Sequence, residues 1–113
     1  MNAFTRLSIS ALIVAFAGCD RSASLEPKKR PPGVPSEAVW AGGADGGAYV
    51  HCAIDRQNNV DKCTVWNDFT GESVSGDYVL LKEHRAATES ELKFTGAANE
   101  FIYLDGGKIL KRR

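Results

Sequence analysis

The sequence has no excess charge of either sign, little cysteine and no long hydrophobic run. Its 113 residues carry 14 Lys and Arg against 14 Asp and Glu, so it lacks the surplus positive charge with which nucleic-acid-binding domains meet phosphates. The longest apolar stretch, 7–17, spans about eleven residues, well short of the roughly 20 that a helix needs to cross a bilayer. The chain is also too short for a dinucleotide-binding unit with a partner domain. We therefore predict no nucleic-acid partner and no cofactor.

Motifs that would carry catalysis or hold a metal are also lacking. His51 and His84 are the only histidines, and no nucleophile elbow such as GxSxG accompanies them. Cys52 and Cys63 are separated by ten residues, whereas structural zinc sites usually bring cysteines in CxxC-like pairs. The sequence therefore predicts no catalytic residue, no metal site and no enzymatic activity.

Two further segments fail to match the ligand-binding loops that they suggest. The glycine-rich stretch 41–47 lacks both the GxGxxG spacing and the Lys-Ser/Thr ending of phosphate-binding loops. The polar stretch 55–61 has alternating oxygen-bearing side chains, but Val60 stands where a calcium loop needs glycine. We expect the first to be a flexible loop or bulge and the second to be a turn.

The first 18 residues have the pattern of an export signal. A single arginine is their only charged side chain, and an apolar stretch follows it. Phe16, Ala17, Gly18 and Cys19 resemble the lipobox of bacterial lipoproteins, although Phe16 stands where leucine is usual. This resemblance covers the signal alone. It implies that residues 1–18 are removed and that lipidated Cys19 anchors the mature protein to a membrane of the bacterial envelope, inner or outer, with the protein facing the periplasm.

The number of cysteines agrees with this assignment. An ordinary signal peptide cut at a nearby small residue is the alternative, and it would leave Cys19 as an unpaired thiol in an oxidising compartment. The chain has three cysteines, so a lipid on Cys19 leaves Cys52 and Cys63 as an even pair. We therefore predict a disulfide between these two.

A proline-rich segment follows the lipobox. Residues 20–36 contain all four prolines and almost no large apolar side chain. This composition predicts an extended tether over 19–36 that joins the anchor to a small folded domain over 37–113. The basic cluster at 28–30 either contacts anionic lipid headgroups or solubilises the linker, and we favour the second interpretation.

The folded part begins with a hairpin pattern. Apolar residues alternate over 48–54, and a β-branched and aromatic run over 60–67 follows a polar turn. If the cysteines lie directly opposite each other, Val50 lies opposite Val65 on the same face. The two runs therefore predict an antiparallel hairpin with the disulfide on its core side.

The remaining sequence continues the β pattern. A third strand is expected over 78–82, a capping-box pattern over 88–91 predicts one or two helical turns, and strands over 101–104 and 108–111 flank the glycine-containing turn 105–107. The predicted fold class is mainly β: a small antiparallel sheet or half-open barrel of about five short strands, with one disulfide and at most one short helix.

Three aromatic residues form the candidate recognition patch. Trp40, Tyr49 and Trp66 fall in or beside the first hairpin, and Tyr49 points away from the predicted core face. They either bind a partner or fill the core on both faces of a thin sheet, and we favour the second interpretation.

The leading hypothesis is a membrane-anchored envelope lipoprotein that acts as a binding or structural module through protein or cell-wall contacts. The alternative is an inhibitor of an envelope-directed hydrolase, because the domain looks broadly like periplasmic lysozyme inhibitors, whose motifs it does not match. A third hypothesis is an envelope enzyme that uses His51 or His84.

Overall fold

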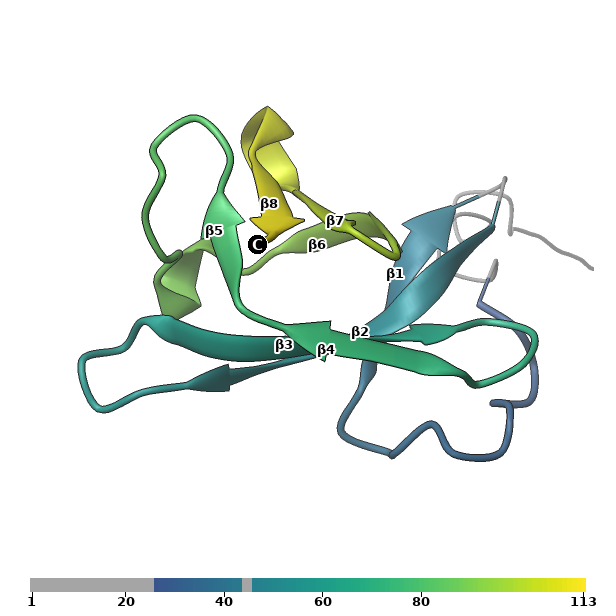
Figure 1. The fold of residues 1–113 in the computed structure, drawn as a ribbon. Helices are drawn as coiled ribbons and strands as arrows, with labels where there is room; N and C mark the ends of the chain where they lie inside the picture. Colours follow the sequence, from purple (N-terminus) through teal and green to yellow (C-terminus); the bar gives the residue numbers. More distant parts are fainter. Residues whose placement is uncertain (1–25, 44–45) are drawn as a thin grey trace, which may run out of the picture.

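The structure, a computed structural model, describes residues 26–43 and 46–113 (Figure 1). The predicted signal segment 1–18 and the predicted lipid-attachment residue Cys19 lie outside the described residues. Among those that are described, no helix is long and apolar enough to span a membrane.

The first sheet contains the predicted hairpin and one further strand on either side of it. Its antiparallel strands follow one another in chain order: β1 (Val39–Gly43), β2 (Gly46–Ile54), β3 (Val60–Asn67) and β4 (Ser73–Gly76). Strands β2 and β3 pair with Cys52 opposite Cys63 and with Val50 opposite Val65. The predicted register is therefore confirmed.

The second sheet is formed by the C-terminal part of the chain. Its strands are β5 (Tyr78–Leu80), β6 (Phe94–Ala98), β7 (Phe101–Leu104) and β8 (Ile109–Arg112), in the antiparallel order β5-β8-β7-β6. Only Asp77 separates β4 from β5, so the chain passes directly from one sheet to the other, as Figure 1 shows. At the far side, β6 contacts β1 and β2.

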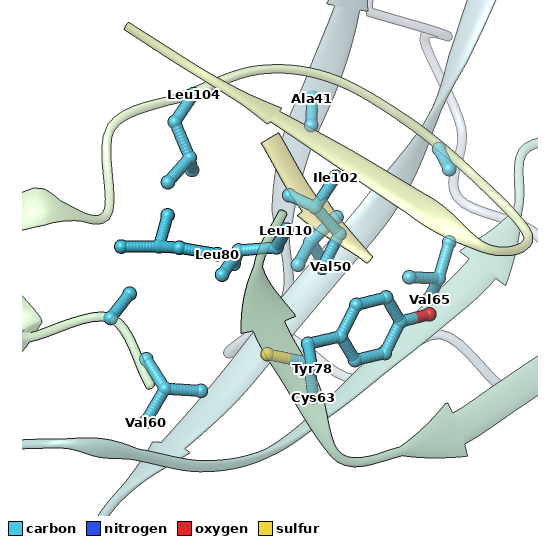
Figure 2. Packing of buried hydrophobic residues seen from close by; sticks show 12 residues of the cluster. Ala41, Val50, Val60, Cys63, Val65, Tyr78, Leu80, Ile102, Leu104 and Leu110 are labelled. Carbon is cyan, nitrogen blue, oxygen red and sulfur yellow. The ribbon is translucent and has the colours of Figure 1, made fainter. Parts of the chain in front are cut away.

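The core lies between the two sheets. Val50 and Cys63 from the first sheet meet Leu80, Ile102 and Leu110 from the second, and all five side chains are fully buried (Figure 2). The face predicted to point inward from β2 is thus the core face. Because the sheets bury one face each against the other, two small sheets share a single core.

Two single turns of 3-10 helix, η4 (Glu89–Glu91) and η5 (Asp105–Gly107), are the helical elements of the described chain. The first begins at the predicted capping box, where the backbone N–H of Thr88 donates to Glu91 Oε1 over 2.9 Å. The second coincides with the predicted glycine-containing turn, where Gly106 has a φ of 78° and Gly107 one of 81°. Glycine suits these positions because positive φ disfavours a Cβ atom.

The mainly β class is confirmed, but the described chain has eight strands where about five were expected. The additional strands β1, β4 and β6 have the sequences VWAGG, SVSG and FTGAA. Small residues have low intrinsic strand propensity, so these segments become strands through pairing with neighbours. The expectation of a loop over 41–47 is accordingly wrong at its ends, because Gly42 pairs with Gly47 between β1 and β2.

Candidate functional site

The three predicted aromatic residues form a continuous row across the first sheet. Trp40 on β1 lies opposite Tyr49 on β2, and Tyr49 lies opposite Trp66 on β3. The rings of Trp40 and Tyr49 meet edge to face, with centroids 5.3 Å apart and planes at 62°, a geometry that aromatic pairs prefer. We call Trp40, Tyr49 and Trp66 the aromatic row.

The aromatic row is on the outer face of the sheet, but its central residue is not accessible. Tyr49 alternates with the core residue Val50, so its side chain points away from the second sheet. Its exposed fraction is nevertheless 0%, while Trp40 and Trp66 are half-buried. A segment from elsewhere in the chain must therefore cover Tyr49.

That cover is residues 26–36, which we call the covering segment. The guanidinium carbon of Arg30 lies 4.7 Å from the centroid of the Tyr49 ring, within cation–π distance. The Tyr49 hydroxyl donates to Glu26 Oε2 over 3.3 Å, and this carboxylate lies 3.9 Å from Arg30 Nη2. In Figure 1 the covering segment runs along the side of the first sheet that faces away from the second.

The covering segment is folded rather than extended. Arg30 Nη1 donates to the carbonyl of Pro35 over 2.7 Å, and the N–H of Val34 donates to the carbonyl of Pro31. Pro31 is buried, and Gly71 of the β3–β4 turn packs directly against Pro32. The expectation of an extended tether is therefore wrong for residues 26–36, because tertiary contacts fix their turns. Proline-rich composition is compatible with either state.

Burial changes the pKa of the Tyr49 hydroxyl. Removal from water raises the pKa of Tyr49 above its usual value of 10.0, and the Glu26 carboxylate beside the hydroxyl raises it further, while Arg30 lowers it. The phenol is thus kept as a hydrogen-bond donor to Glu26, since ionisation would place two negative oxygens side by side.

The two histidines lie in separate places. His51 is on β2, where its Nδ1 lies 3.7 Å from Glu37 Oε2. His84 is exposed in the loop after β5, with a positive φ of 54°. Among residues 26–43 and 46–113 neither imidazole hydrogen-bonds to a Ser, Thr or Cys side chain, and no group of three or more His, Cys, Asp or Glu residues is placed to hold a metal ion.

The predicted disulfide is present. Cys52 and Cys63 are bonded across the β2–β3 pair, and Cys63 is fully buried in the core. The bond therefore joins the central strands of the first sheet at the face that packs on the second.

Sequence reasoning missed the most exposed aromatic residue of the described chain and the two residues that cover Tyr49. Phe69, in the β3–β4 turn, has an exposed fraction of 88%, the largest among the exposed large hydrophobic residues of the described chain. An aromatic residue between turn-forming neighbours was the available signal for it. Nothing local in the sequence marks Glu26 and Arg30, because their contacts with Tyr49 cross about 20 residues of chain.

Comparison of the chain with protein-family models, with curated proteins and with solved structures finds no match.

Proposed function

We propose that this protein is a lipid-anchored lipoprotein of the bacterial envelope whose β domain is a binding or structural module. The observation that carries the proposal is the disulfide between Cys52 and Cys63, because such bonds persist in oxidising compartments. It accounts for two of the three cysteines. The third, Cys19, stands directly after the small residues Ala17 and Gly18, where an acylated cysteine would stand.

The covering segment brings the domain close to its anchor. The described structure begins at Glu26, and six residues, 20–25, lie between it and Cys19 in the sequence. Seven fully extended steps of chain reach at most about 25 Å. The domain is thus held near the lipid surface, and its protein or cell-wall partner lies in the layer of the envelope next to that membrane.

The intact mass of the protein from a membrane fraction tests the proposal. The expected mature chain begins at acylated Cys19, and two further thiols react with an alkylating reagent only after reduction. A protein that keeps residues 1–18, or whose Cys52 and Cys63 alkylate without reduction, contradicts the proposal. Replacement of Cys19 by serine serves as the control, because it removes the acyl mass and leaves the disulfide unchanged.

The hydrolase-inhibitor hypothesis is separated from this proposal by adding the purified protein to lysozyme. A binding or structural module leaves lysozyme activity unchanged, whereas an inhibitor abolishes it at near-stoichiometric amounts. The enzyme hypothesis is tested by the double substitution His51→Ala/His84→Ala, and full complementation of a deletion phenotype by this variant contradicts it.

A further inference from the structure

Strand β2 extends beyond the strand that pairs with one of its edges. Strand β1 accompanies it only as far as Val50, which lies opposite Val39. The chain before β1 turns at this point, where the N–H of Ala38 donates to the carbonyl of Pro35 over 3.2 Å. Strand β2 itself continues to Ile54. Its last residues therefore have β3 on one side and no strand of the described chain on the other.

The pairing pattern gives the direction of the free backbone groups. The N–H of Asn67 donates to the carbonyl of Glu72 over 2.7 Å, away from β2, so Ala48 and Asn67 form a pair without hydrogen bonds. Such pairs alternate along an antiparallel ladder, and Ala48, Val50 and Cys52 share this phase. The N–H and C=O of Cys52 thus point away from β3. No backbone hydrogen bond from a described residue reaches either group.

Ile54 repeats this arrangement at the end of β2. It lies opposite Val60, whose N–H donates to the carbonyl of Ala87 over 2.7 Å and so points away from β2. The N–H and C=O of Ile54 therefore also point to the side on which β1 is absent. Free backbone groups at alternate residues of a strand edge are what an added strand pairs with.

A pocket lies beside this free edge. Its volume is about 310 Å³, and its apolar lining includes Val50, Ile54, Leu92 and Phe94. Val50 is fully buried and the other three are half-buried against the core. On a strand added opposite Cys52, the facing side chain would point to the same side of the sheet as Cys52. That side chain would enter the pocket.

The charged side chains that line the pocket are mainly acidic. Glu37 and Glu89 line it, and His51 is the only basic residue that does. The His51 Nδ1 lies 3.7 Å from Glu37 Oε2, whereas no cation of the described chain lies within ion-pair distance of Glu89. The lining is therefore negative whether or not the imidazole is protonated. Positively charged side chains complement it.

We propose that the free edge of β2 and this pocket, together the β2 edge site, bind an extended peptide of a partner protein as an additional strand. An apolar residue of the peptide lies opposite Cys52, and basic residues on either side of it lie beside Glu37 and Glu89. The backbone groups of Cys52 and Ile54 pair with the peptide. This inference rests on the proposed binding function and names its class of partner, but it does not depend on the lipid at Cys19.

Fluorescence anisotropy with designed peptides tests the inference. The probe is a fluorescein-labelled peptide with the central sequence Lys-Val-Lys between threonines, titrated with the mature protein in detergent. We expect it to bind and its Glu-Val-Glu counterpart not to bind. Methylation of the valine nitrogen should weaken binding at least about tenfold, because it removes the N–H that donates to the carbonyl of Cys52 and places a methyl group against the strand edge.

Substitutions and NMR locate the binding. Glu37→Gln/Glu89→Gln should weaken binding of the Lys-Val-Lys peptide roughly tenfold, because each exposed ion pair contributes about threefold. Glu72→Gln/Glu83→Gln removes the same charge from exposed positions outside the β2 edge site and should leave the affinity unchanged. In proton–nitrogen NMR spectra, the amide signal of Cys52 should shift on addition of the peptide and its exchange with solvent should slow.

Each opposing outcome identifies what fails. A protein that binds none of the peptides at millimolar concentration overturns the inference, and so does equal affinity for the methylated and unmethylated peptides. Shifts confined to another strand edge, such as the amide of Ser75 on β4, also overturn it. A Cys52 amide that shifts with protein concentration alone shows that a second copy occupies the site, which overturns the peptide partner. Absence of the acyl mass on Cys19 in the same sample contradicts the proposed anchor and leaves the peptide result standing.

Discussion

The guanidinium of Arg30 lies over the ring of Tyr49, 4.7 Å from its centroid, and covers this central residue of the aromatic row. This contact joins the covering segment to the second strand of the first sheet. The aromatic row is therefore part of a second, smaller apolar layer on the outer face of the sheet, in which only its flanking tryptophans reach the surface.

Substitution of Arg30 is expected to loosen the covering segment. Arg30→Ala should lower the free energy of unfolding by about 1–2 kcal/mol, because it removes a partly buried cation–π contact and the hydrogen bond to Pro35. Urea denaturation measures the change. Arg56→Ala, in the exposed turn after β2, is the matched control and should have little effect. Equal losses in the two variants would show that Arg30 contributes nothing specific.

The raised pKa of Tyr49 predicts a loss of stability in alkaline solution. Burial first, and Glu26 second, keep the folded-state pKa of Tyr49 above the value of 10.0 that applies when the chain unfolds. The resulting stabilisation is fully present below pH 10 and is lost as the pH rises through the folded-state pKa. Tyr49→Phe should therefore flatten the decline in unfolding free energy above about pH 10. Parallel pH curves for the two proteins would contradict the assignment.

Loss of the disulfide is expected to be costly for so small a domain. Cys52→Ala/Cys63→Ala should reduce the free energy of unfolding by about 3 kcal/mol, since the bond closes a loop with a sequence separation of 11. Chemical denaturation with and without reductant measures this loss. Reductant should destabilise the wild-type protein and leave the double variant unaffected. A wild-type protein that is insensitive to complete reduction would refute the prediction.

Two glycines at the start of the first sheet provide a matched pair of substitutions. A Cβ atom at Gly47 would collide with the carbonyl of Ala41 and with Gly42, whereas one at Gly43 would meet no atom of the described residues within 4 Å. Gly47→Ala should therefore destabilise the protein by about 1–3 kcal/mol through overpacking, and Gly43→Ala should change stability by less than about 0.5 kcal/mol. Thermal unfolding compares the two variants, and similar melting temperatures would show that β1 and β2 do not approach closely.

The hairpin was predictable because its signals are local. Alternation over 48–54 sets the inward face, and the cysteine pair sets the register of β2 and β3 through a single covalent constraint. Strands β4 and β6 were not predictable in the same way, since they consist largely of Ser, Gly and Ala, small residues that do not favour strands. Their partners, β3 and β7, are neighbours along the chain, so the missing signal was in the residues of β4 and β6 themselves.

By itself, the sequence determined the mainly β class, the register of the first hairpin and the disulfide, because periodicity and cysteine spacing act over a few residues. Tertiary structure decided which aromatic side chains reach solvent. Tyr49 is buried because Trp40 packs against its ring and because Glu26 and Arg30 fold back over it, across a sequence separation of 23 from Glu26. Phe69 stays exposed because its turn is held by backbone contacts to Asn67 and leaves the ring without a neighbour to cover it. Long-range packing, which no local pattern encodes, thus separates the aromatic residues of the core from those of the surface.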